Sequence, residues 1–363
     1  MEGALTRVLL ADSGARARHQ IALWAERGVE SVVAVNVSAA ECAWPDEADY
    51  AVWNGADAAD LPTASRLVGG SMDAGCDAID GGPLADDLDL MDLAVRSNLV
   101  VVGTDPHSAA RWTQTEFLAE LATSVKVPFR FDAEEDPTLQ RRLDVLVLVD
   151  RPGNVSVLGG LERSCGPSGD APWLVEFGAV LGEGAWATLR DSSRTLCQQA
   201  GAPGLVRVQW RYLAQSGWTF RGMRAALPPG SALAEPVAGV DLSRLRLNAW
   251  FGGSGVIADL EAERHGVQAR VVALEEGEVS PTLPQGFIAD VEPHQPVFPG
   301  QSLGAIQAVG PSRRAALVQL RAQLEALPEF GVSTNAAALV AASGRRDWWD
   351  GRFGVAESRD FFA

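Results

Sequence analysis

The residue types that most often carry chemistry are present along this chain, but they are not grouped as in common catalytic or metal sites. The four cysteines are widely separated and none forms a Cys-x-x-Cys pair, so the sequence predicts neither a zinc site nor a disulfide framework. The four histidines are equally scattered, which favours structural or surface roles. No Gly-x-x-x-x-Gly-Lys-Ser/Thr stretch occurs, which excludes a P-loop, and the turn Ala11–Ala17 holds one glycine, which disfavours dinucleotide binding.

Arginines are the remaining candidates for ligand binding, because a guanidinium group pairs with carboxylates and phosphates. The basic candidates in the middle of the chain are Arg142, Arg163, Arg207, Arg224 and Arg270. They would have to form a local basic pocket against a net charge of −17. That charge disfavours nucleic acid as a partner, since binding its phosphates requires clustered lysine and arginine.

The composition is that of an ordinary globular protein. The 363 residues are 47% hydrophobic and 21% charged, and the length allows two or three domains. No run of about eighteen apolar residues occurs, so no membrane span or membrane partner is predicted. The N-terminal residues lack the pattern of a secretory signal, and we therefore expect a cytoplasmic protein.

Residues 1–125 alternate short apolar runs with helical patterns, which predicts a parallel, Rossmann-like sheet. The predicted strands are 7–11, 29–37, 48–53, 76–80 and 99–103, and the predicted helices are 15–27, 63–74, 88–96 and 108–122. The polar, acidic residues 126–139 are typical of a connector. The pattern then changes to antiparallel hairpins at 144–158 and 204–223, with a helix predicted over 183–199 between them.

One longer segment carries a recognisable motif. From Phe220 to Leu242 the chain matches the pattern F-x-E-M-N-x-R-x-Q-V-E-H-P-V-T-E-x-x-x-G-V-D-L without a gap, at Phe220, Met223, Glu235 and Gly239–Leu242. Weaker matches follow in the correct order elsewhere, at 7–17, 48–52, 76–82, 265–276 and 310–339. Together they resemble biotin carboxylases, the ATP-grasp components of biotin-dependent carboxylases.

This resemblance implies a mixed α/β and α+β fold with three domains. A Rossmann-like N-terminal (pre-ATP-grasp) domain would occupy residues 1–125. A truncated ATP-grasp core without its lid would occupy 126–258, because the connector 126–139 is too short for the family's glycine-rich lid. A biotin-carboxylase-like C-terminal domain would occupy 259–363.

The alignment departs from the family at the positions that carry its chemistry. The two metal-binding glutamates fall at Gln209 and Gly222, and the asparagine beside the second falls at Arg224. The catalytic arginine falls at Ala226, and the proposed general base falls at Gly230. Magnesium must bridge ATP phosphates to carboxylates in this chemistry, and these positions supply none.

The phosphate-binding parts depart in the same way. The lysine that meets ATP phosphate falls at Thr115. The motif G-T-V-E-F falls on Val206–Trp210 (VRVQW), and R-H-I-E falls on Arg141–Asp144 (RRLD), which places an arginine at position 142. Arg270 matches the family's contact to bicarbonate or carboxybiotin, but we favour the simpler interpretation of a strand arginine paired with an acid such as Glu275.

Large aromatic rings are frequent in and near this core. The tryptophans there are Trp186, Trp210, Trp218 and Trp250. We expect these rings to fill the space that a nucleotide would otherwise occupy, because protein interiors are close-packed.

The sequence therefore predicts a catalytically inactive biotin carboxylase homologue that acts as a structural or regulatory subunit of a biotin-dependent acyl-CoA carboxylase assembly. No ATP, magnesium or biotin site is expected. The expected partners are biotin carboxylase, biotin carrier or carboxyltransferase subunits, or a second copy of the chain. The alternative is a ligand-binding protein or residual ATP-dependent carboxylase or ligase that uses the remnant groove, with Arg142, Arg224 and Arg270 as ligand contacts. A dehydrogenase-like Rossmann protein is disfavoured by the missing glycine motif.

Overall fold

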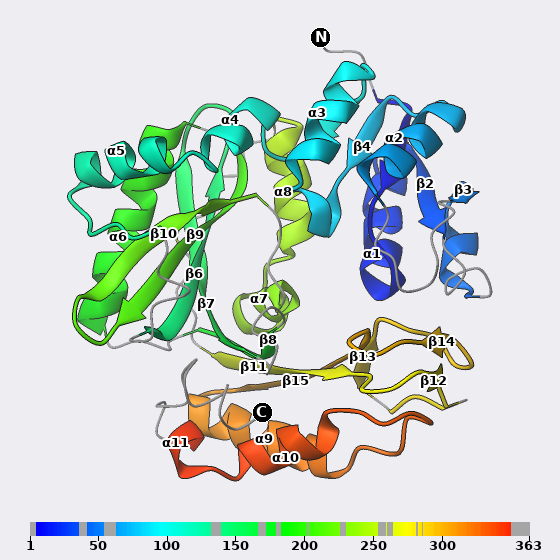
Figure 1. Ribbon diagram of the computed structural model, residues 1–363, viewed down its shortest axis with the longest axis vertical. Helices are drawn as coiled ribbons and strands as arrows, with labels where there is room; N and C mark the ends of the chain where they lie inside the picture. Colours follow the sequence, from blue (N-terminus) through cyan, green and yellow to red (C-terminus); the bar gives the residue numbers. More distant parts are fainter. Residues whose placement is uncertain are drawn as a thin grey trace. The chain divides into compact units, whose positions relative to one another are not determined.

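The computed structural model describes residues 5–35, 42–53, 63–131, 139–165, 172–178, 183–201, 203–225, 230–252, 259, 264–280, 282–284 and 286–349. The chain forms two compact units (Figure 1). One comprises Met1–Pro106, Val271–Ala305 and Leu327–Asn335; the other comprises His107–Arg270, Ile306–Ala326 and Ala336–Ala363. The C-terminal part of the chain thus contributes to both units, and the three-domain boundaries after residues 125 and 258 stay predictions.

The first unit contains a five-stranded parallel sheet with the order β3-β2-β1-β4-β5. Its strands are β1 (Arg7–Leu10), β2 (Glu30–Val35), β3 (Tyr50–Trp53), β4 (Ala78–Asp80) and β5 (Val100–Val102). The helices α1 (Gly14–Ala25), α2 (Ala64–Asp73) and α3 (Leu88–Arg96) alternate with them. Buried side chains such as Leu9, Val32 and Ile79 fill the core beneath the helices, which explains why these strands are almost wholly apolar. The predicted Rossmann-like sheet is confirmed.

The helix predicted over 108–122 is wrong in one respect, because the chain forms two helices there. α4 spans Pro106–Arg111 and α5 spans Thr115–Val125. Gln114, the residue before α5, has an extended backbone with ψ 115°, and this breaks the helical hydrogen-bond pattern. Trp112 lies in the break with only 4% of its surface exposed. Burial of this ring outweighs the local helical pattern.

The second sheet has eight strands in the order β10-β9-β6-β7-β8-β11-β15-β13. They are β6 (Leu139–Val149), β7 (Val155–Cys165), β8 (Pro172–Phe177), β9 (Gly204–Leu213), β10 (Gly217–Arg224), β11 (His265–Val272), β13 (Phe287–Ala289) and β15 (Ser302–Gly310). The neighbours from β10 to β11 pair antiparallel, which confirms both predicted hairpins. Residues 126–138 connect α5 to β6, and β12 (Gly277–Glu278) pairs with β14 (Pro296–Val297).

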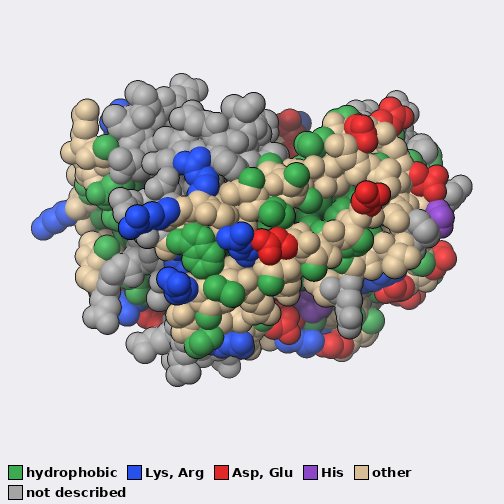
Figure 2. All heavy atoms as spheres, turned by 90° about the horizontal axis from the view of Figure 1, so that it is seen from below, with side chains coloured by type: hydrophobic (Ala, Val, Ile, Leu, Met, Phe, Trp, Pro, Cys, Tyr) green, Lys and Arg blue, Asp and Glu red, His purple; other side chains and the backbone are tan. Residues whose placement is uncertain are grey.

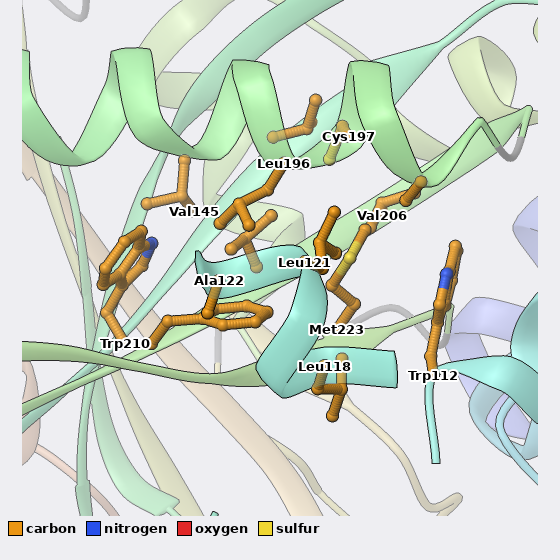
Figure 3. Packing of buried hydrophobic residues seen from close by; sticks show 14 of the residues in the cluster. Trp112, Leu118, Leu121, Ala122, Val145, Leu196, Cys197, Val206, Trp210 and Met223 are labelled. Atoms are coloured by element: carbon orange, nitrogen blue, oxygen red, sulfur yellow. The ribbon is translucent and has the colours of Figure 1, made fainter. Parts of the chain in front are cut away.

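Helices cover the two faces of this sheet differently (Figure 1). On one face, α5 and α6 (Glu183–Ala200) enclose an apolar core in which Leu118, Leu196 and Met223 meet (Figure 3). On the other face, α7 (Ala234–Ala238) and α8 (Leu242–Trp250) cover the end of the sheet where Leu148 and Leu205 lie. Asp241 caps α8 by accepting a hydrogen bond from the backbone of Arg244, as expected for the start of a structural helix.

The C-terminal helices are α9 (Arg313–Glu325), α10 (Ala336–Ser343) and α11 (Arg346–Trp349). Figure 2 looks onto α9 and α10, where apolar side chains lie beside those of arginine. Val318 on α9 is 54% exposed, and α10 consists of apolar residues apart from its final serine. Among the described residues, no helix has both the length and the apolar composition needed to cross a lipid bilayer.

An ion pair joins α9 to the sheet. Nε and Nη2 of Arg313 donate to the two carboxylate oxygens of Glu176 on β8, each at 2.7 Å, and Nε2 of His265 lies 3.0 Å from Oε2. Burial by itself would raise the pKa of the Glu176 carboxyl. The hydrogen bonds to His265 and Arg313 outweigh burial and lower the pKa from 4.5 to about 2. The ionised form of Glu176 is therefore strongly stabilised in the folded protein.

We expect this pair to contribute to acid unfolding. The ordinary carboxyl pKa is 4.5, so the stabilisation from Glu176 is complete above pH 4.5 and is lost as the pH falls towards 2. Since each pKa unit corresponds to about 1.4 kcal/mol, the free-energy difference between the wild type and Glu176→Gln should shrink by a few kcal/mol over this range. Urea unfolding at pH 7, 4.5 and 3 measures it. Glu325→Gln, at an exposed pair, is the control, and parallel profiles for the wild type and Glu176→Gln would contradict the prediction.

Candidate functional site

The two positions assigned to the metal-binding glutamates lie side by side in the structure. Gly222 on β10 is the cross-strand partner of Gln209 on β9, and Gln209 is in turn the partner of Asp144 on β6. Directly opposed residues of antiparallel strands share one face of the sheet. The three residues therefore form a row across neighbouring strands, in which Asp144 and Gln209 lie on the face away from α5 and α6. At Gly222 the strand register is shifted, and a Cβ there would meet Cδ1 of Leu118 on α5.

Guanidinium groups flank this row. Along β9, Arg207 and Arg211 alternate with the apolar residues that face α6, so they share the face of Gln209. The Asp144 carboxylate has 0% of its side chain exposed. Nε of Arg163 lies 3.1 Å from its Oδ2, Nη2 of Arg163 donates to Oδ1 at 3.3 Å, and Nη1 of Arg207 lies 3.6 Å from Oδ2. The Asp144 carboxylate, which lies beside Gln209, is thus already paired with arginine.

Positively charged groups surround the Asp144 carboxylate in this row. Complete burial raises the pKa of the Asp144 carboxyl, but Arg163, Arg207 and Arg211, together with a hydrogen bond from Gln209, lower it below its usual range. Nearby guanidinium groups and hydrogen bonds both favour the ionised carboxylate over its neutral form. The carboxylate is therefore already neutralised by the arginines beside it.

The donors at this row do not fit magnesium. Mg²⁺ requires hard oxygen ligands, usually with one or two carboxylates, whereas this row offers the amide of Gln209, a glycine and a carboxylate held by guanidinium groups. In the described ranges, no group of three or more His, Cys, Asp or Glu is arranged to hold a metal ion.

The general-base position cannot hold a side chain in this fold. Gly230 has φ +85°, a left-handed conformation that favours glycine. A Cβ atom at this position would lie 2.5 Å from Cγ1 of Val175 on β8, well inside van der Waals contact. The glycine is needed for this close approach, so a carboxylate could not be restored here by simple substitution.

The structure places the predicted ligand arginines on the same face of the sheet. Arg142 pairs with Arg211 and with Arg163, and Arg224 pairs with Arg207. Arg270 lies on β11 two residues after Gln268, which pairs with Val175, itself the partner of Arg163. That these arginines bind a ligand stays a prediction.

The remaining predicted positions are less informative. Thr115 is the first residue of α5, and Ala226 lies outside the described residues. Glu275, the acid suggested as a partner for Arg270, accepts a hydrogen bond from the backbone of Ser333 at 2.8 Å.

The expectation that Trp210 fills nucleotide space is wrong. Trp210 follows Gln209 on a strand, so the two side chains point to opposite faces. Its indole Nε1 donates to Oγ of Ser193 on α6 at 2.9 Å, and its ring is 1% exposed within the core shown in Figure 3. Trp186 and Trp218 pack against the same core. These rings are structural residues behind the sheet.

The positions of Asp144 and Arg211 beside Gln209 were not predicted from the sequence. The signal was present in Arg207–Arg211 (RVQWR), where arginine, glutamine and arginine recur at every second residue of a strand. Such alternation places three polar groups on one face of β9. It does not indicate which residue of another strand lies opposite them.

Comparison with known proteins finds likeness in three-dimensional structure only. No protein-family model and no curated protein sequence matches the chain. Among solved structures, the multifunctional pyruvate carboxylase from Rhizobium etli aligns with a TM-score of 0.86 at 19% identity, over 99% of this chain and 37% of that one. The Kluyveromyces lactis urea amidolyase aligns with a TM-score of 0.84 at 20% identity, over 98% of this chain and 22% of that one.

Biotin carboxylase domains align along their whole length. The domain of the 2-oxoglutarate carboxylase from Hydrogenobacter thermophilus, a dimer in complex with MgADP, ADP and bicarbonate, has a TM-score of 0.86 at 15% identity over 100% of this chain and 99% of that one. The chain therefore has the biotin carboxylase fold. It spans only about a third of the multidomain pyruvate carboxylase, and the corresponding share of urea amidolyase is smaller.

Proposed function

We propose that this protein is a non-catalytic biotin-carboxylase-like subunit with a structural or regulatory role in a biotin-dependent carboxylase assembly. The observation that carries the proposal is the row Asp144, Gln209 and Gly222, where arginines bind the one carboxylate and the other two positions lack one. Loss of a single preorganised electrostatic group typically costs about 10²–10³ in rate. Several such groups are altered together here, and Gly230 leaves no space for a base.

Two features support a role in an assembly. The solved proteins with this fold include domains of larger biotin-dependent carboxylases, and one is a dimer. On this chain, α9 and α10 expose apolar side chains, including Val318. An exposed valine on a helix surface is compatible with a protein–protein contact, which the co-purification experiment below examines. We propose biotin carboxylase, biotin carrier or carboxyltransferase subunits, or a second copy, as partners in the cytoplasm.

The catalytic part of the proposal is tested by turnover. Purified full-length chain is incubated with Mg²⁺, ATP, bicarbonate and free biotin, and ADP release is measured beside an active biotin carboxylase. We expect no ADP release above the protein-free background. Bicarbonate-dependent ADP release by this chain would contradict the proposal.

Restoring the two acids should not restore turnover. In the double variant Gln209→Glu and Gly222→Glu, the carboxylate at position 209 lies beside Arg207 and Asp144, so we expect it to pair with a guanidinium group. The side chain at position 222 begins next to Leu118 on α5. Among the described residues, a Cβ at Gly222 meets only Cδ1 of Leu118, at an ordinary 3.6 Å, so the side chain is sterically allowed. The same ADP assay measures the result. Mg²⁺-dependent turnover by the double variant would show that the groove is still competent.

The assembly part of the proposal is tested separately. The tagged chain is purified from its native host under mild conditions, and the eluate is probed with labelled streptavidin for a biotinylated carrier. We expect a biotinylated protein to co-elute at a fixed ratio. Elution of the chain alone as a monomer would count against the subunit role, whatever the turnover assay gives.

A further inference from the structure

The basic face of the eight-stranded sheet extends over four neighbouring strands. Arg224 lies on β10, Arg207 and Arg211 on β9, Arg142 on β6 and Arg163 on β7, and the strand register places all of them on the face of Gln209. Towards the other end of the same face, the side chains are apolar and are covered by α7 and α8. The arginines are therefore confined to one end of this face.

Asp144 pairs with two of these arginines. Its carboxylate contacts Arg163 through both oxygens and lies near Arg207, and the side chains of Arg163 and Arg207 are each 14% exposed. A guanidinium group carries five N–H donors in a planar fork. For Arg163, Nη2 donates to Oδ1 of Asp144, and Nε lies 3.1 Å from Oδ2 as part of the ion pair. The charge of Asp144 thus keeps both guanidinium groups nearby, while their side chains keep some contact with solvent.

We propose that this basic face binds a carboxylate or phosphate group directly through guanidinium groups, without a divalent metal. Guanidinium forks match the geometry of both oxyanions, and an anion is the ligand that guanidinium groups favour. The composition of the face agrees with this reading, because Arg142, Arg207 and Arg224 lie on it beside a single carboxylate, Asp144, that is already paired with arginine.

The test uses two probes of the shared chemistry. Pyrophosphate and malonate are titrated separately into the full-length protein by isothermal titration calorimetry, first in EDTA and then with excess Mg²⁺. We expect saturable binding of at least one probe in EDTA, with no tightening by Mg²⁺. Tighter binding of pyrophosphate assigns the site to phosphate compounds, and tighter binding of malonate assigns it to carboxylic acids. Absence of saturable binding in EDTA, or binding only with Mg²⁺, would overturn the inference.

Two variants locate the site. Arg224→Gln removes a guanidinium from a partly exposed position, and Gln209→Glu adds a negative charge at nearly constant volume. Each should weaken binding in EDTA about tenfold or more, since Arg224→Gln removes a charged donor and Gln209→Glu adds a charge that repels the anion. Arg321→Gln on α9, whose partner Glu325 is exposed, should leave the dissociation constant unchanged. Near-ultraviolet circular dichroism confirms folding, and unchanged binding in both site variants would refute the location.

Different results would contradict the anion-binding inference and the proposed non-catalytic function. Turnover with Mg²⁺ and ATP would remove the non-catalytic assignment but would leave metal-free anion binding to be judged by the titration in EDTA. Conversely, if the protein binds neither pyrophosphate nor malonate in EDTA, the anion-binding inference is contradicted. The proposed non-catalytic role is unaffected by that result.

Discussion

Replacement of Asp144 by asparagine should lower the free energy of unfolding by about 3–5 kcal/mol, the usual cost of removing one partner of a buried ion pair. Asparagine has nearly the same volume, so the loss is electrostatic. The carboxylate side chain has 0% exposure and lies within 3.6 Å of both Arg163 and Arg207, whose positive charges would remain. Guanidinium chloride unfolding at pH 7 measures the change.

The control for this prediction is an exposed ion pair of the same residue types. Asp191 on α6 contacts Arg194 at 3.2 Å, but its side chain is 60% exposed. Asp191→Asn should therefore cost less than about 1 kcal/mol. A double-mutant cycle that combines Asp144→Asn with Arg163→Gln should show a large coupling energy. If Asp144→Asn cost as little as Asp191→Asn, the pairing of Asp144 with arginines assigned to this row would be wrong.

Replacement of Trp210 by alanine should lower the free energy of unfolding by about 3–5 kcal/mol, because it leaves a cavity in a close-packed core. The ring is 1% exposed, and its indole is the hydrogen-bond partner of Ser193, which is fully buried. Trp210→Phe keeps most of the ring volume, so it should cost only about 1–2 kcal/mol, chiefly for the lost hydrogen bond. Denaturant unfolding of the two variants measures the difference.

Nucleotide binding provides the independent measurement for Trp210. Because the ring lies on the face opposite Gln209, removing it should not create binding of ATP in the presence of Mg²⁺. Trp53→Ala, at a position that is 60% exposed, should change stability by only about 0.5 kcal/mol and is the matched control. A gain of Mg²⁺-ATP binding by Trp210→Ala would revive the interpretation that the ring fills nucleotide space.

The sequence alone determined the class and order of the elements. Apolar runs alternating with helical patterns predicted the parallel sheet of β1–β5, and strand-like runs on both sides of short turns predicted the two hairpins. The ungapped match from Phe220 to Leu242 also indicated the fold that the structural comparisons show. These signals are local, because strand and helix periodicity are properties of a few consecutive residues.

Only the tertiary structure decided how the site is built. Alternation along β9 places Arg207, Gln209 and Arg211 on one face, but nothing in that segment indicates that Asp144 lies opposite Gln209. Cross-strand register between distant segments is fixed by the packing of the whole sheet, as are the burial of Trp112 in a helix break and the contact between Gly230 and Val175. The alignment with the family motif indicated that Gln209 and Gly222 stand where the motif has glutamates. The fold showed that Asp144, the cross-strand neighbour of Gln209, is paired with arginines.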